Sequence, residues 1–259
     1  MKIAFFDSGI GGITVLHQAM LTLPEEDYLY YADVDHVPFG KKTREQIVSY
    51  TDEALRFMIG RGVKAVVVAC NTATCSAIGY LRGKYPLPIL GMEPAVKPAV
   101  EENDTGRVLV VATPVTVKGE KLQNLLSRVD GRHCVDTLAL PELVTFAERG
   151  EFVSPGVRAY LAEKFRPYRL DAYSALVLGC THFNYFKDTF HRFLPQKAEI
   201  IDGSEGTVNH LADVLRRSGG LEKNSGAVEY YASGRRVTGP AELKRIAGLH
   251  ARLDQMLRY

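Results

Sequence analysis

Residues Ala65–Thr72 read AVVVACNT, and residues Ala175–His182 read ALVLGCTH. In each stretch an apolar run leads into a small residue, then a cysteine, then a hydroxyl or amide side chain. Short runs that are apolar throughout are typical of strands covered by helices on both faces of a sheet. The repeated pattern therefore predicts two similar strands, each followed by a cysteine.

Apolar runs and longer amphipathic stretches alternate along the rest of the chain, which is the pattern of parallel α/β architecture. Helical periodicity predicts helices within Arg44–Arg61, Glu120–Val129, Ser154–Phe165 and Thr207–Arg217. The predicted strands are Ile3–Phe6, Tyr28–Tyr31, Ala65–Val68, Ile89–Leu90, Val108–Val111, Asp136–Leu140, Ala175–Leu178, Glu199–Ile201 and Val228–Tyr231.

Two interruptions of this alternation indicate crossings between two lobes. Prolines and acidic residues separate strand runs within Met92–Thr105, and a short Gly/Ser/Glu turn follows a strand at Asp202–Gly206. We therefore expect a first lobe of residues 1–95 and 207–259, which contains Cys70, and a second lobe of residues 96–206, which contains Cys180.

The composition is that of an ordinary soluble globular protein, with 46% apolar and 24% charged residues in 259. The net charge is +2 and its charges are interspersed, which argues against a nucleic-acid partner. The N-terminal apolar stretch is too short for a signal peptide, and no run approaches the roughly 18 apolar residues of a membrane helix. Four cysteines are too sparse for a disulfide scaffold, so we expect a cytoplasmic protein with no membrane contact.

Polar motifs follow several predicted strands directly. In open α/β sheets, ligands bind in the crevice beyond the carboxyl ends of the strands. The motifs at that end are Asp7-Ser8-Gly9, Cys70-Asn71-Thr72, Thr113-Pro114 and Cys180-Thr181-His182. If the strands are parallel within each lobe, these motifs converge on one region, which is where we expect the functional site.

The two cysteines allow three interpretations. Buried cysteine is often only a small hydrophobe. Here each cysteine precedes residues that begin a helix, and a helix N-terminus lowers a thiol pKa from about 8.5, which favours a base or nucleophile. Zinc would accept Cys70, Cys75, Cys180 and His182 as ligands, but their sequence spacings suit a metal poorly, so we expect no metal.

Alternatives also remain for the neighbouring polar residues. The glycine-rich segment Ser8–Gly12 either cradles phosphate or lets a second group approach closely while Asp7 orients or deprotonates it; it lacks the lysine and spacing of nucleotide loops. Asp7 itself is alternatively a solvated helix cap. His182 is either a buried core histidine or the proton partner of Cys180. Glu148 is, by composition, a helix end.

Four motifs together resemble one known family, the aspartate/glutamate racemases, and in particular its glutamate racemases. The motifs are FDSGIGG (Phe6–Gly12), PFG (Pro38–Gly40), ACNTAT (Ala69–Thr74) and LGCTHF (Leu178–Phe183), in the family's order and across nearly the whole chain. The resemblance implies two pseudo-symmetric α/β lobes with mainly parallel sheets and an active site in the cleft between them. It also implies racemisation of glutamate without pyridoxal phosphate, other cofactor or metal.

The resemblance further implies roles for individual residues. Cys70 matches the base for D-glutamate, assisted by Asp7, and Cys180 matches the base for L-glutamate, assisted by His182; Glu148 matches a carboxylate on the Cys180 side. It implies a homodimer and a supply of D-glutamate for peptidoglycan synthesis. The residues that match substrate-binding positions are Ser8, Pro38, Phe39, Gly40, Asn71, Thr72 and Thr181.

The chain departs from the family pattern at three places. Phe39 replaces the more usual tyrosine, Phe183-Asn184-Tyr185 replaces an aromatic-proline step, and VATPVT (Val111–Thr116) lacks a glycine often found in that loop. His182 favours glutamate over aspartate as substrate. The alternatives are a racemase of aspartate or another acidic amino acid, a related decarboxylase or isomerase, and a catalytically silent ligand-binding protein. Retention of both cysteines argues against the decarboxylases, which keep only one.

Overall fold

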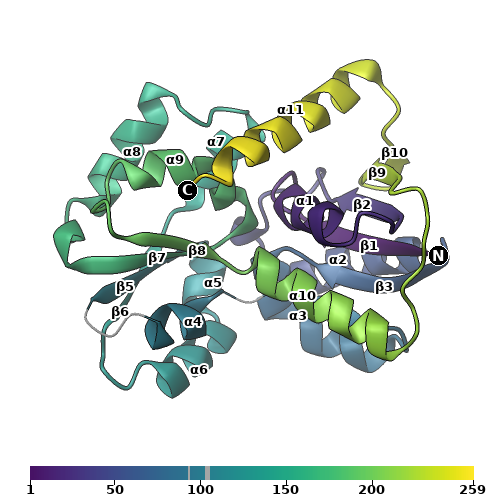
Figure 1. Cartoon of the computed structure of the whole chain (residues 1–259), viewed down its shortest axis with the longest axis horizontal. Helices are drawn as coiled ribbons and strands as arrows, with labels where there is room; N and C mark the ends of the chain where they lie inside the picture. The colour runs from purple at the N-terminus through teal and green to yellow at the C-terminus, as the bar shows by residue number, and fades with distance from the viewer. Residues whose placement is uncertain (93, 103–105) are drawn as a thin grey trace.

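Two sheets form the centres of two lobes in the computed structural model, which describes residues 1–92, 94–102 and 106–259 (Figure 1). The strand order is β10–β9–β2–β1–β3–β4 in the first sheet and β6–β5–β7–β8 in the second. The strands are β1 Lys2–Asp7, β2 Tyr28–Ala32, β3 Val63–Val68, β4 Ile89–Gly91, β5 Arg107–Ala112, β6 Val135–Ala139, β7 Tyr173–Gly179, β8 Glu199–Asp202, β9 Val228–Ala232 and β10 Arg235–Arg236.

The pairing of the strands confirms the predicted pseudo-symmetric α/β fold. β3 is parallel to β1 in the first sheet, and β7 is parallel to β5 in the second. The two cysteine-bearing strand ends therefore occupy equivalent positions, each beside the first strand of its own lobe. Every predicted strand is present; β10, which pairs antiparallel with β9, was not predicted because two arginines carry no strand pattern.

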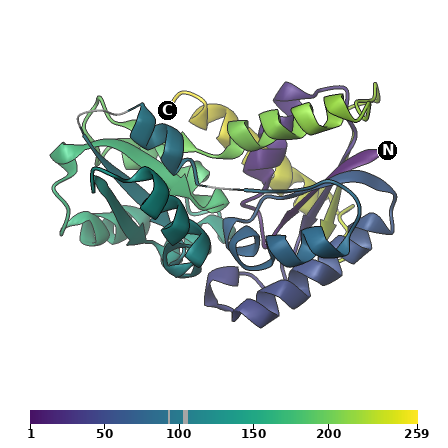
Figure 2. The same ribbon diagram turned by 90° about the horizontal axis from the view of Figure 1, so that it is seen from below.

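Helices connect the strands and cover both faces of each sheet (Figures 1 and 2). Many are shorter than two turns, and those at the cleft include 3₁₀ turns. The helices are α1 Ile13–Thr22, η1 Phe39–Lys41, α2 Arg44–Ile59, α3 Asn71–Lys84, α4 Val96–Glu101, α5 Pro114–Lys118, α6 Glu120–Val129, α7 Pro141–Glu148, α8 Pro155–Phe165, η2 Leu170–Ala172, η3 Thr181–Phe186, α9 Lys187–His191, α10 Ser204–Arg217 and α11 Pro240–Met256.

In the first lobe, alternate side chains of β1 pack against different helices on the two faces of the sheet. Ile3 and Phe5 pack in the core that includes α1, α10 and α11, whereas Ala4 and Phe6 pack in a second core with α2 and α3. All four side chains are fully buried. A strand buried on both faces explains why its sequence is apolar throughout.

In the second lobe, β5 has the same arrangement. Leu109 and Val111 pack toward α7, α8 and η3, and Val108 and Val110 pack toward α4 and α6. The core that contains Leu109 is continuous with the core of the first lobe that contains Ile3. Apolar burial thus joins the two lobes and does not merely fill each of them.

One of the two predicted crossings between the lobes differs in detail from the structure. The turn predicted at Asp202–Gly206 ends earlier, because α10 begins at Ser204 and Asp202 accepts a hydrogen bond from the Ser204 N–H at 2.8 Å. Within the predicted crossing Met92–Thr105, Glu93 and residues 103–105 lie outside the described residues. The helices of the described ranges are all too short or too polar to span a lipid bilayer.

Candidate active site

Cys70 follows β3 and is the N-cap residue of α3, with 6% of its surface exposed. Its Sγ accepts a hydrogen bond from the Ala73 N–H at 3.5 Å and donates to Ser8 Oγ at 3.8 Å. Burial raises the pKa of the Cys70 thiol, and the nearby Asp7 raises it further. The expected lowering of this pKa is therefore wrong, because desolvation outweighs one helix N–H group.

Cys180 follows β7, and its neighbours differ from those of Cys70. The residues after it form the 3₁₀ helix η3, and no hydrogen bond from that helix caps its sulfur. The Phe183 N–H bonds instead to the Cys180 carbonyl at 3.0 Å. The expectation of helix N–H groups around both sulfurs is thus wrong for Cys180, whose Sγ lies 3.9 Å from His182 Nδ1.

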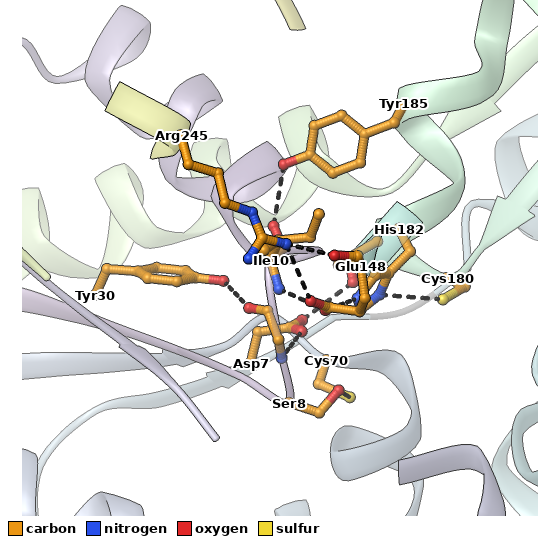
Figure 3. A network of polar contacts seen from close by, with 12 residues as sticks. Asp7, Ser8, Ile10, Tyr30, Cys70, Glu148, Cys180, His182, Tyr185 and Arg245 are labelled. Carbon is orange, nitrogen blue, oxygen red and sulfur yellow. Dashed lines mark hydrogen bonds and ion pairs between the residues drawn. The ribbon is translucent and has the colours of Figure 1, made fainter. Parts of the chain in front are cut away.

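His182 and Glu148 form an ion pair behind Cys180 (Figure 3). Glu148, the last residue of α7, accepts hydrogen bonds at Oε1 from His182 Nε2 at 2.7 Å and from the Ile10 N–H at 2.9 Å. Burial acts to lower the pKa of His182, but its bonds to Cys180 and Glu148 outweigh burial and raise that pKa well above its ordinary value. Burial acts to raise the pKa of Glu148, but the bond from His182 reverses this and holds that pKa low.

Asp7 ends β1 and is fully buried, so it is not a solvated helix cap. Its Oδ1 accepts a hydrogen bond from the Gly9 N–H at 3.0 Å, and its Oδ2 accepts one from the Thr181 hydroxyl at 3.0 Å. Burial raises the pKa of Asp7, although His182 and the two hydrogen bonds oppose this shift. Asp7 thus connects the first lobe to the residue beside Cys180.

Side chains of the second lobe pack directly against the glycine-rich turn Ser8–Gly12. The glycines therefore allow a second group to approach closely, and the turn does not form a phosphate cradle. A Cβ atom on Gly9 would lie 1.9 Å from Glu148 Oε1, and one on Gly11 would lie 2.4 Å from both His182 Nδ1 and Thr181 Oγ1. Only glycine leaves room for these contacts.

Threonines form a further contact between the lobes. Thr72 Oγ1, on α3, lies 2.9 Å from Thr113 Oγ1, at the end of β5, and Thr113 donates to Thr116 Oγ1 at 3.1 Å. Gly40 of the PFG turn packs against Thr113, since a Cβ atom there would lie 3.3 Å from the threonine Cβ. The lobes are therefore also in contact through these threonines.

One small cavity lies between the lobes, and both cysteines line it. Its volume is about 10 Å³, which is room for about one water molecule. Asn71, which lines it, has a buried Oδ1 with no hydrogen-bond partner in the described chain. The lining residues are Ser8, Pro38, Phe39, Gly40, Cys70, Asn71, Thr72, Thr113, Val144, Cys180, Thr181 and His182.

The structure thus brings together nearly all of the predicted site residues. Asp7 and Glu148 do not line the cavity but contact residues that do. Cys75, one of the residues considered as zinc ligands, is absent from the lining, and the described ranges contain no cluster of three or more metal-ligating side chains. Sequence reasoning missed Val144 as a site residue and named Thr113 only as part of a strand-end motif, since neither carries a reactive group.

Comparison with known proteins identifies the family to which this chain belongs. The family model for Asp/Glu/hydantoin racemases matches residues 15–211. The glutamate racemase of Lachnospira eligens is 55% identical over 99% of this chain and 99% of its own. This chain belongs to the Asp/Glu/hydantoin racemase family.

Solved structures of this racemase family share the whole fold. Glutamate racemase of Escherichia coli, in complex with L-glutamate and an activator, is 28% identical, covers 95% of each chain and superimposes with a TM-score of 0.83. The Francisella tularensis enzyme in complex with D-glutamate is 25% identical, covers 98% of this chain and 93% of its own, and has a TM-score of 0.81. The two-lobed racemase architecture is therefore that of the present chain.

Proposed function

We propose that this chain interconverts L-glutamate and D-glutamate by a two-base mechanism in which Cys180 and Cys70 are the bases. The observation that carries this proposal is that the two sulfurs, one from each lobe, line a single cavity. Racemisation must remove the α-proton from one face of the substrate and return a proton to the other. Two bases on opposite sides of one carbon meet that requirement.

The reaction of L-glutamate begins at Cys180. Its thiolate takes the α-proton, so that the Cα–H bond breaks, an S–H bond forms and the electron pair stays on Cα. The Cys70 thiol then gives its proton to the opposite face, which forms the new Cα–H bond and leaves Cys70 as a thiolate. From D-glutamate the same steps run in reverse, with the two cysteines exchanging roles.

The surroundings of the cysteines suit these starting states. Burial and Asp7 favour the protonated thiol of Cys70. The protonated His182 places a positive charge 3.9 Å from Cys180 Sγ, beside the sulfur that is proposed to act first on L-glutamate. Asp7 and His182 are therefore proposed as assisting groups, and Glu148 as the carboxylate that keeps His182 charged.

The remaining cavity residues are proposed to hold the amino acid. The unpartnered Oδ1 of Asn71 offers an acceptor to the substrate ammonium group, which would remove the cost of an unpaired buried acceptor. Ser8, Thr72 and Thr181 present hydroxyl groups at the same cavity, and Pro38, Phe39 and Gly40 close it with a turn. Donors arranged in advance around the α-carboxylate would stabilise charge that builds up during proton transfer.

The cavity volume has a mechanical consequence for this proposal. A space of about 10 Å³ is far smaller than glutamate, so the lobes must separate before substrate enters. The same small volume means that a closed complex would exclude bulk water, which protects a carbanion from non-specific protonation.

We further propose a first lobe of residues 1–95 and 207–259, a second lobe of residues 96–206, a cytoplasmic homodimer and a role in supplying D-glutamate for peptidoglycan synthesis.

Incubation of the pure, reduced protein with L-glutamate in D₂O tests this function. Optical rotation should decay to zero while deuterium enters the α-position of D-glutamate. L-Aspartate in a parallel reaction should keep its rotation, and a chelator should leave the glutamate rate unchanged. Glutamate that keeps both its rotation and its α-hydrogen would overturn the proposal, racemisation of aspartate instead would reassign the substrate, and loss of activity with the chelator would revive the metal alternative.

A further inference from the structure

Arg245 of the C-terminal helix α11 reaches the site from outside the two sheets (Figures 1 and 3). Its Nη2 donates a hydrogen bond to the backbone carbonyl of Glu148 and lies 3.8 Å from Glu148 Oε2. About half of the arginine side chain is exposed, whereas Glu148 is largely buried. The guanidinium therefore covers the solvent side of this carboxylate.

The contacts of Glu148 divide between its two oxygens. Oε1 accepts from His182 Nε2 and from the Ile10 N–H, so the ion pair with Arg245 uses Oε2. Three separate parts of the chain thus hold one carboxylate: η3, the glycine-rich turn and α11. With its backbone carbonyl bound as well, Glu148 has little freedom to turn away from His182.

His182 connects Glu148 to the sulfur of Cys180, which is a reacting atom in the proposed mechanism. Its Nε2 faces Glu148 and its Nδ1 faces Cys180 Sγ, so a rotation of Glu148 would release the ring that the sulfur contacts. The partner of an imidazole nitrogen sets the state and orientation of the other nitrogen. Cys70 has no equivalent support from α11, since its sulfur contacts Ala73 and Ser8.

We propose that Arg245 is a positioning residue for the Cys180 half of the reaction and acts by holding Glu148 against His182. This inference rests on the two-base function proposed above. It gives α11 a role in the chemistry, although no residue of that helix lines the cavity between the cysteines. An ion pair exposed to solvent contributes little to stability, so the effect is expected in catalysis and its pH dependence.

Other titratable groups face this ion pair from every side. Asp7 approaches from β1, Tyr30 from β2, and Tyr185 and Cys180 from the second lobe. Burial raises the pKa of both tyrosines well above its ordinary value, so they stay neutral in the working range. Removal of the arginine charge should raise the pKa of Glu148 and, by weakening its hold on His182, lower that of His182.

The test compares Arg245→Met, Arg245→Lys and Arg252→Met in glutamate racemisation between pH 5 and 10. Arg252 is a matched control, because it ties the same helix to the second lobe through the Tyr185 carbonyl at 2.8 Å and Asp188 at 2.6 Å without touching Glu148. We expect Arg245→Met to lower kcat/KM about tenfold, which is the effect of a small misplacement of a catalytic group. The acidic limb of its kcat/KM–pH profile should move to higher pH and the basic limb to lower pH. Arg245→Lys should restore part of the profile, and Arg252→Met should leave both limbs in place.

The outcomes separate this inference from the proposed function. An Arg245→Met profile that matches the unsubstituted protein would overturn the inference and leave the function intact. Equal narrowing in Arg252→Met would also overturn it, because loosening of α11 would then be the cause. Absence of glutamate racemisation in the unsubstituted protein would overturn the proposed function itself.

Discussion

Asp7 is a buried residue near the cysteines that is proposed to assist catalysis and that lowers the stability of the fold when it is ionised. It is a fully buried carboxyl group, and its hydrogen bonds from Gly9 and Thr181 do not offset the loss of solvent, so its pKa is raised. A raised carboxyl pKa means that the fold favours the protonated form. The stabilisation is complete below the unfolded-state pKa and is lost as pH rises through the folded-state value.

Asp7→Asn should therefore stabilise the protein at pH 8, where the carboxyl group of the unfolded chain is ionised and the buried site in the folded protein penalises that charge. Asparagine has the same shape, and its amide still accepts from Gly9 and can donate to Thr181. We expect a rise in Tm of about 2 to 6 °C at pH 8 by calorimetry, a smaller rise at pH 4, and a large loss of racemisation. Asp171→Asn, at an exposed ion pair with Arg169, is the control and should change neither. A Tm at pH 8 below that of the unsubstituted protein would contradict this assignment.

Residues at strand ends were predictable because a local pattern marks them. An apolar strand followed by Cys70 or Cys180 identifies its own end, and parallel strands bring such ends to one edge. Val144 and Arg245 carry no such mark, since each reaches the site from a helix whose sequence is that of an ordinary surface helix. Their positions depend on packing between segments far apart in the chain, and no local sequence pattern specifies that packing.

The glycine-rich turn after β1 is the element on which closure of the site depends. Glu148, His182 and Thr181 occupy the space that Cβ atoms on Gly9 and Gly11 would need. The turn is also held from outside, because Tyr30 donates to the Gly9 carbonyl at 2.6 Å and Tyr185 donates to the Ile10 carbonyl at 3.0 Å. A fixed turn without side chains at these points lets the second lobe dock closely.

Gly11→Ala should prevent that docking. The added methyl group would lie 2.4 Å from His182 Nδ1, so the imidazole would have to move away from Cys180 or the lobes would have to separate. We expect a fall in kcat/KM of about a hundredfold or more, measured by circular dichroism of glutamate, with the fold retained. Activity within twofold of the unsubstituted protein would show that the turn is not in contact with the second lobe in the working enzyme.

Gly79→Ala provides the matched control within the same lobe. Gly79 lies inside α3, and a Cβ atom there would have no neighbour within 4 Å. Because glycine is a poor helix former, the substitution should stabilise the protein by about 0.5 to 1 kcal/mol and leave racemisation unchanged. A loss of stability in denaturant titration would contradict the open space around this position.

The bounds of most predicted elements lie within two residues of the observed ones. β1 and α6 match their predicted ranges to within one residue at either end. The sequence prediction was wrong for residues 204–206, because Gly and Ser suggest a turn although Asp202 stabilises the start of α10 there. It also gave no warning of the 3₁₀ helix after Cys180, since the choice between α and 3₁₀ geometry depends on packing against neighbouring segments.

At the level of the whole molecule, the site exists only where the lobes meet. One continuous apolar core contains residues of both lobes, and α11 packs against both α1 and η3. The Asp7–Thr181 hydrogen bond crosses the boundary, as do the Ile10–Glu148 and Thr72–Thr113 hydrogen bonds. Sequence patterns predicted two lobes, and the family resemblance implied one cleft between them, but the depth of their contact follows from side-chain packing that no local pattern specifies.

Exchange of the α-hydrogen in single-cysteine variants tests most directly whether the two sulfurs act on opposite faces of one carbon. Cys70→Ala and Cys180→Ala are each incubated with L-glutamate and with D-glutamate in D₂O, and proton NMR follows the α-hydrogen while chiral separation follows the enantiomers. We expect racemisation to fall by about a hundred- to ten-thousandfold in both. Any residual exchange should be confined to L-glutamate in Cys70→Ala and to D-glutamate in Cys180→Ala. Substantial racemisation in either variant, or exchange of the same enantiomer by both, would contradict the two-base arrangement.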